Sequence, residues 1–159
     1  MKTFINKKRL SFILLLSILA LPATVNAKSS NGYANAYIKQ LERMDNNYDC
    51  DSYFIHDISG DGVPELFVIT GECEMDYMLH IFTYRNGKVK KITTTGAGHS
   101  GYKKGNGCLI CGWGHQGSEA YWKLYLKGGK LKSPSIKRSI WNNANYVDQY
   151  DIDDYSPLK

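Results

Sequence analysis

The sequence predicts an α+β fold in which an N-terminal helix packs on a mostly antiparallel β-meander sheet. One helical apolar pattern stands near the start, the rest of the chain reads as short apolar runs, and glycine-rich turns separate these runs. Strands joined by short turns pair with their sequence neighbours, which favours a meander with the helix across one face. No linker interrupts the pattern, so we expect a single β-rich domain.

The first 27 of the 159 residues read as a secretory signal peptide. Basic residues precede an apolar run from Leu10 to Leu21, and a small-residue cleavage site ends at Ala27. The run is too short for a stable membrane span, and no later stretch approaches that length. We therefore expect a secreted or periplasmic protein of residues 28–159, with no membrane span after signal cleavage.

The helix and the tail stand at opposite ends of this domain. Asn31 is suited to cap a helix, because its side chain accepts a bond from a free amide of the first turn. The apolar positions that follow fall on one helical face: Tyr33, Tyr37, Ile38, Leu41 and Met44. The polar tail, residues 142–159, is expected to be only partly ordered.

The segments between helix and tail read as strands joined by tight turns. Asn86-Gly87 is a strong hairpin signal, and Gly105-Asn106-Gly107 and Gly128-Gly129 mark two further turns. The expected strands cover residues 53–55, 66–69, 78–84, 88–94, 101–104, 108–113, 120–126 and 131–132.

The loop between the first two strands, in the segment DISGDGVPELFVI, carries oxygen donors at alternate positions. Calcium takes several hard oxygen ligands, and glycines supply the backbone angles that wrap a chain around an ion. The expected ligands are the side chains of Asp57, Ser59, Asp61 and Glu65 and the carbonyl of Val63. An EF-hand does not fit, because its twelfth loop position would be Val68 and no helix precedes the loop. The alternative is a metal-free turn held by Asp and Ser bonds to backbone amides.

This segment resembles the Asp-x-Asp-Gly-Asp-Gly-x-x-Asp/Glu loop of FG-GAP and VCBS repeats, which joins two antiparallel strands and binds calcium. It is also similar to small secreted bacterial proteins that carry one such loop near the N terminus of a β-rich domain. The resemblance implies a calcium ion in a structural role. Two features depart from the pattern: the chain has one copy instead of an array, and Ser59 replaces an acidic residue, which weakens the expected affinity.

Four cysteines follow the leader, and export makes disulfides the default expectation. Antiparallel pairing about a turn centred near Asp61 places Cys50 almost opposite Cys73, which predicts a disulfide between them. Cys108 and Cys111 lack the βαβ context of a thioredoxin dithiol. Residues three apart in a strand point to opposite faces, which argues against a zinc site with the nearby histidines. A local disulfide or two free thiols remain.

Two copies of Gly-His-x-Gly flank the hairpin that turns at Gly107. Symmetry about that residue places His99 opposite His115, with Trp113 and Glu119 close in sequence. These four residues form a candidate ligand site, second metal site or acid–base pair. Alternatively, both histidines hold turn conformations through hydrogen bonds. We assign no catalytic residue, because no nucleophile, base and orienting group can be read together.

Charge is unevenly distributed along the chain. Removing the four basic residues of the leader lowers the formal net charge from +5 to +1. Residues 28–82 carry −7, residues 83–141 carry +11 and the tail carries −3. These regions can neutralise one another within one fold, or they can leave a basic face for an anionic partner. We do not expect nucleic-acid binding from an exported chain that lacks an aromatic-basic pattern.

Three functions are compatible with these features. The leading interpretation is a secreted or periplasmic, calcium-stabilised, non-enzymatic binding or accessory module with an unidentified protein or glycan ligand. The second is a small hydrolase that uses His99 and His115. The third is an inhibitor or immunity-type protein that presents the basic half to an anionic partner.

Overall fold

A computed structural model describes residues 32–73, 76–97 and 101–159 of the chain. The leader, Asn31 and His99 of the sequence predictions lie outside the described residues.

The predicted helix is present as α1, Gly32–Asp45. Its buried side chains follow a spacing of three, four and three residues, so they form one apolar stripe: Ala34, Tyr37, Leu41 and Met44. The helix ends where Asn46 and Asn47 donate side-chain hydrogen bonds of 2.6 Å to the last carbonyls. It begins at residue 32, so it is not at the start of the printed chain.

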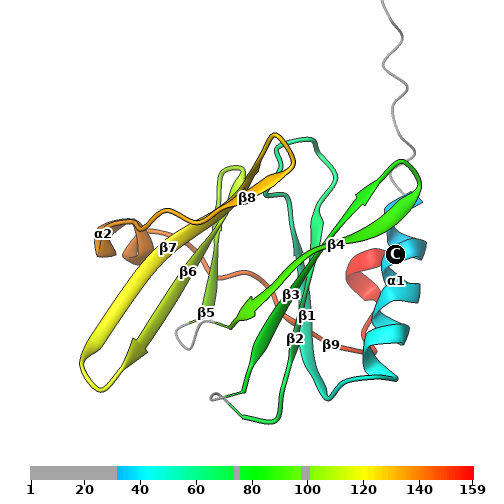
Figure 1. Cartoon of the computed structure of the whole chain (residues 1–159), viewed down its shortest axis with the longest axis horizontal. Helices are drawn as coiled ribbons and strands as arrows, with labels where there is room; N and C mark the ends of the chain where they lie inside the picture. The colour runs from blue at the N-terminus through cyan, green and yellow to red at the C-terminus, as the bar shows by residue number, and fades with distance from the viewer. Residues whose placement is uncertain (1–31, 74–75, 98–100) are drawn as a thin grey trace, which may run out of the picture.

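The strands form two antiparallel sheets, where one meander was predicted (Figure 1). Sheet A has the order β4-β3-β2-β1-β9, and sheet B has the order β5-β6-β7-β8. Their bounds are β1 Cys50–His56, β2 Glu65–Thr70, β3 Met78–Arg85, β4 Lys88–Gly96, β5 Gly101–Gly105, β6 Cys108–His115, β7 Ser118–Lys127, β8 Lys130–Lys132 and β9 Tyr150–Asp151. The simple meander is wrong at two points: the chain leaves sheet A after β4, and β9 returns from the tail to pair with β1.

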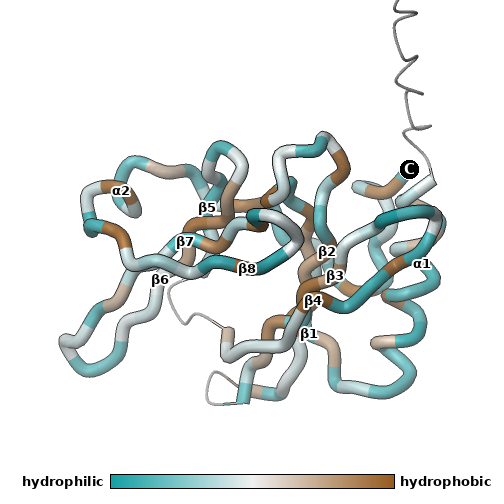
Figure 2. The backbone as a smooth tube through the Cα atoms, turned by 45° about the horizontal axis from the view of Figure 1, so that its top comes forward, coloured by the Kyte–Doolittle hydropathy of each residue, from teal (hydrophilic) through white to brown (hydrophobic). Residues whose placement is uncertain are grey.

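Sheet A lies between α1 and sheet B, so both of its faces are covered (Figure 1). Every residue of β2 is buried; Leu66 and Val68 pack with α1, whereas Phe67 and Ile69 pack toward sheet B. Phe54 of β1 stacks on Phe67 with ring centroids 4.7 Å apart. Figure 2 shows apolar stretches gathered where β1 to β4 run through the middle of the molecule. A continuous apolar run suits a strand buried on both faces, and this explains the second sheet.

The tail is part of the fold, in contrast to the expected partial order. β9 pairs with Ser52 and Tyr53 of β1, and Val147 and Leu158 are buried. The segment before β9 covers β5: the Lys104 amide donates to the Asn145 carbonyl at 2.7 Å, and the Val147 amide donates to Tyr102 at 3.1 Å. The tail is ordered because it satisfies backbone groups at two sheet edges. The other short elements are α2, Arg138–Asn142, and η1, Ser156–Leu158.

A buried lysine attaches α2 to the outer face of sheet B. Lys103 is only 7% exposed, and its Nζ donates to the Trp141 carbonyl at 3.0 Å. The same nitrogen lies 4.4 Å from the Trp141 ring centroid and 4.5 Å from that of Tyr146. Trp141 also packs on Gly112, where an added Cβ would stand 2.9 Å from the indole. The carbonyl and the two ring faces compensate for the loss of water around the ammonium.

Candidate functional site

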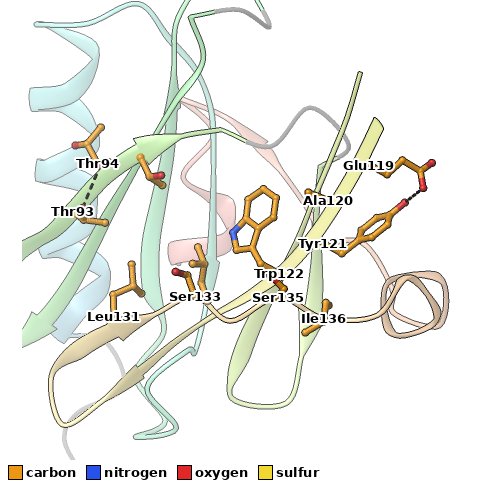
Figure 3. A pocket seen from close by; sticks show the side chains of 12 residues that line it. Thr93, Thr94, Glu119, Ala120, Tyr121, Trp122, Leu131, Ser133, Ser135 and Ile136 are labelled. Atoms are coloured by element: carbon orange, nitrogen blue, oxygen red, sulfur yellow. Dashed lines mark hydrogen bonds between the residues drawn. The ribbon is translucent and has the colours of Figure 1, made fainter. Parts of the chain in front are cut away.

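An open pocket of about 740 Å³ lies where the edge of sheet A faces sheet B (Figure 3). Sheet B is also joined to the loop after β1, because the Leu126 amide of β7 donates to the Ile58 carbonyl at 2.8 Å. The lining comes from β4, from β7 and from β8 with the segment that follows it: Thr93, Thr94, Thr95, Glu119, Ala120, Tyr121, Trp122, Leu124, Leu131, Ser133, Ser135 and Ile136.

Trp122 forms the aromatic wall of the pocket. Alternate residues of β7 face sheet A; Leu124 and Leu126 are buried there, whereas Trp122 is only half-buried. Figure 3 shows its indole standing between β7 and β4. On β4, Thr93 and Thr95 pair with residues whose side chains face sheet B, so their hydroxyls lie on the pocket side. An aromatic surface beside a few hydroxyls is typical of ligand sites.

The carboxylate of Glu119 is neutralised on the face of β7 that points away from Trp122 (Figure 3). Glu119 Oε2 accepts the Tyr121 hydroxyl at 3.0 Å, and Arg138 Nη1 lies 3.2 Å from the same oxygen. Of the predicted ligand-site residues that the structure describes, Glu119 is the one among the lining residues of this pocket.

The predicted histidine site stays a prediction, because His99 lies outside the described residues. His115 pairs with Ser118 at the turn between β6 and β7 and is exposed, and its ring centroid lies 6.5 Å from that of Trp113. The hairpin of β5 and β6 pairs Gly101 with Gly112, whereas symmetry about Gly107 requires residue 113 at that place. The predicted register was therefore wrong by one residue.

The loop after β1 is organised by Asp57. Its Oδ1 accepts the amides of Ser59 at 3.0 Å and Gly60 at 2.7 Å, and its Oδ2 accepts the amide of Gly62 at 2.9 Å. Both glycines have positive φ, +73° and +79°, which lets the chain curl around the carboxylate. Partial burial alone would raise the pKa of Asp57, but the three amides more than offset it and lower that pKa. Asp57 is thus an ionised anchor of the loop.

The other two loop carboxylates have separate partners. Asp61 Oδ1 accepts the Val63 amide at 3.0 Å. Glu65 is 1% exposed; it accepts the Ile58 amide and the Thr83 hydroxyl, each at 3.0 Å, and burial raises its pKa to about 6. Within the described residues, no three His, Cys, Asp or Glu side chains are grouped to hold a metal ion. The loop therefore has the hydrogen bonds of a closed turn, and calcium binding stays a prediction.

The predicted Cys50–Cys73 disulfide is not formed in the structure, in which all four cysteines are free thiols. Cys50 lies opposite Thr70, so the register of the hairpin differs from the one assumed about Asp61. Cys73 is exposed beyond the end of β2, in a turn where its amide donates to Asp76 Oδ1 at 2.9 Å. That turn directs the chain into β3 and takes Cys73 out of the strand pair.

The other two cysteines serve packing. Cys111 is buried in the core between the sheets, where burial and the neighbouring Cys108 raise its thiol pKa. Cys108 is half-buried beside the turn that ends β5. His56 secures this turn, because its Nε2 lies 3.0 Å from the Gly105 carbonyl oxygen and 2.8 Å from that of Cys108.

Sequence reasoning missed most of the pocket. Thr93, Thr95, Trp122 and Ser135 belong to segments that are far apart in the chain, and only the packing of sheet A against sheet B brings them together. One local signal was available: an uncharged Thr-Thr-Thr run follows the lysines of β4.

Comparison of the chain with protein-family models, with curated proteins and with solved structures found no match. In the described part of the chain, no helix has both the length and the apolar character that a membrane crossing requires. The chemistry of the site itself is therefore the basis for a function.

Proposed function

We propose that the chain is an exported, non-enzymatic binding module that holds its ligand in the pocket between sheet A and sheet B. The observation that carries this proposal is the pocket of about 740 Å³ with Trp122 as its aromatic wall. A volume of this size lies within the range of natural ligand sites. Removal of the leader after Ala27 leaves α1 as the N-terminal element of the exported domain.

The chemistry of the lining supports binding. Threonine and serine hydroxyls offer hydrogen bonds, and Trp122, Leu131 and Ile136 offer apolar surface. The one carboxylate, Glu119, is already held by Tyr121 and Arg138. Among the described residues of the lining there is no His or Cys, so these residues supply no paired nucleophile and base.

The test follows the three tryptophans separately. Protein labelled with fluorotryptophan gives one fluorine NMR signal each for Trp113, Trp122 and Trp141, assigned with single Trp→Phe variants. Panels of short extended peptides and of neutral and anionic oligosaccharides are then titrated. We expect a saturable shift of the Trp122 signal, with Trp113 and Trp141 as internal controls. A panel that leaves Trp122 unmoved, or moves all three signals alike, contradicts a ligand site in this pocket.

We also propose that calcium stabilises the loop of residues 57–65. The donor set, Asp57, Ser59, Asp61, the Val63 carbonyl and Glu65, consists entirely of oxygen. The charges of Asp57 and Asp61 add to burial in raising the pKa of Glu65, so the three carboxylates repel one another. A divalent cation would relieve this repulsion. Binding requires Asp61 and Glu65 to exchange their present hydrogen bonds for the ion.

Thermal unfolding tests the calcium proposal. Calcium at one hundred times Kd contributes roughly 2.7 kcal/mol to the free energy of unfolding, which corresponds to a midpoint several degrees higher than in EDTA. Magnesium should do less, because it dehydrates reluctantly. Asp61→Ala should abolish the response, and Asp153→Ala, an exposed acid outside the loop, should keep it. A wild-type midpoint indifferent to calcium means that the loop is only a turn.

A further inference from the structure

We infer that the pocket accepts an extended peptide segment, which adds as a strand to the free edge of β4 and bears acidic side chains at its end beside the β4 lysines. This inference rests on the proposed function and names the ligand class of the same pocket. Both a peptide and a saccharide are compatible with a binding pocket of this kind. The free backbone edge of β4 favours the peptide.

In the part of the chain that the structure describes, the edge of β4 is the long uncovered strand edge. The tail covers β5, through the bonds of Lys104 and Val147. β8 and the segment after it cover β7, where the Lys123 amide donates to Pro134 at 3.1 Å and the Ile136 amide donates to Tyr121 at 2.9 Å. The other terminal strands, β8 and β9, have three and two residues, whereas β4 has nine. No backbone hydrogen bond joins the outer side of β4 to another described segment. A long open edge is a template for another strand.

The register identifies the groups that this edge presents. The Ala97 amide donates to the Tyr77 carbonyl at 2.9 Å, so residue 97 points its backbone toward β3. Antiparallel strands alternate in this respect, so Thr93 and Thr95 also bond to β3, whereas Thr94 and Gly96 direct their N–H and C=O outward. The Thr94 carbonyl accepts one bond of 3.3 Å from the Thr93 hydroxyl, which leaves its second lone pair (Figure 3).

Side-chain charge shows which part of β4 is open to a partner. Natural edge strands often carry lysines, which discourage another strand from pairing with them. Lys88, Lys90 and Lys91 occupy the first half of β4. The half that lines the pocket, Thr93 to Thr95, is uncharged, contains no proline and consists of β-branched residues. Those three lysines are exposed, and none has an acidic partner among the ion pairs of the described residues. A segment that pairs with Thr94 and continues toward them meets unneutralised positive charge, which favours acidic side chains at that end.

The facing wall favours a strand over a compact ligand. Across the pocket from β4 stand Trp122 and the serines of the segment after β8 (Figure 3). Successive side chains of an added strand point to opposite faces. One set would therefore contact Trp122 and Leu131, while the other set faces away from sheet B. The pocket thus specifies alternation, with apolar side chains on the inner positions.

Selection from a random linear peptide library displayed on phage supplies the probe. We expect enriched sequences without proline, with apolar or β-branched residues at alternate positions and acidic residues at one end. A synthetic copy of the best sequence is then N-methylated at one residue at a time. Strand addition predicts a loss of affinity of about tenfold at every second residue and little change between, because only alternate amides face β4.

Two substitutions of Thr94 give the matched test on the protein. Thr94→Pro removes the outward N–H, and proline is tolerated at such an edge position, so the variant should fold and bind the peptide about tenfold more weakly. Thr94→Val keeps the amide but removes the hydroxyl that lies 3.2 Å from His80 Nδ1, so it should bind within about twofold of wild type. Lys90→Glu with Lys91→Glu should weaken binding and reduce its dependence on salt.

The outcomes separate this inference from the proposed function. Loss without a period of two in the N-methyl series, equal binding by Thr94→Pro, or a library without binders overturns strand addition. If an oligosaccharide then moves the Trp122 fluorine signal, the pocket still binds a ligand and only the peptide class is wrong. A dimer of the protein that Thr94→Pro dissociates would show that a second copy, and not a peptide, occupies the edge of β4.

Discussion

Sheet A and sheet B differ in how the face that points away from the other sheet is covered. In sheet A, α1 covers the face opposite sheet B, and β2 is buried along its whole length. In sheet B, α2 covers part of the outer face through Trp141 and the buried ammonium of Lys103. Most of β7 stays half-buried or exposed. The difference indicates that sheet A provides the stable core and that sheet B, with the edge of β4, provides the surface available for recognition.

The largest expected loss of stability tests whether sheet A is the stable core and the pocket wall is not. Phe67→Ala removes a fully buried ring stacked on Phe54, and it should lower the free energy of unfolding by about 3–5 kcal/mol. Trp122→Ala should cost clearly less, because the indole is only half-buried at the pocket. Urea denaturation measures both variants. Equal losses would mean that the pocket wall belongs to the core.

A medium effect comes from the carboxylate buried beneath the loop. The pKa of Glu65 is raised from 4.5 to about 6 by burial, so the folded state prefers the protonated form. The associated stability is complete below pH 4.5 and is lost as pH rises through about 6, and it amounts to roughly 2 kcal/mol. Denaturation in EDTA between pH 4 and pH 7 measures it.

Glu65→Gln provides the control for that pH dependence. Burial and the charge of Lys91 lower the pKa of His80, which makes stability rise with pH and opposes the change from Glu65. The difference between wild type and Glu65→Gln isolates the carboxylate, and Glu119→Gln serves as a more exposed comparison. A wild-type profile parallel to that of Glu65→Gln would show that Glu65 does not titrate in this range.

The smallest expected effect lies at the edge of sheet B. Lys104 Nζ and Asp148 Oδ2 are 2.7 Å apart, with side chains 48% and 68% exposed. Solvent screens such a pair, so a double-mutant cycle with Lys104→Ala and Asp148→Ala should give a coupling below about 1 kcal/mol. A larger coupling would place this edge, and the tail that covers it, within the stable core.

Local elements were predicted well because their signals are local. The spacing of Tyr37, Leu41 and Met44 is sufficient for α1, and Asn86-Gly87 is sufficient for the hairpin of β3 and β4. The strand registers were predicted less well. In the hairpin of β1 and β2 and in that of β5 and β6, the strands pair about a different centre from the turn residue that the sequence suggested. Since side chains alternate along a strand, one residue of displacement changes which groups face each other.

The sites were predicted only where their residues are consecutive. The loop of residues 57–65 is visible in sequence because Asp57, Gly60 and Gly62 act on their own backbone. The pocket is not visible, because Thr94 and Trp122 meet only after two sheets have packed. The same holds for Lys103, whose burial depends on Trp141 and Tyr146 from the region after β8.

Within the described residues, the sequence by itself determined α1 but not α2, eight of the nine strands and the glycine turns that join them, since these depend on patterns within a few residues. Tertiary structure decided that the strands divide into two sheets, because the apolar run of β2 needs cover on both faces. It also decided that the tail is ordered, since β1 and β5 present edges that the tail can satisfy. The open edge of β4 beside Trp122 follows from that same packing, because it is the long edge that no described segment covers.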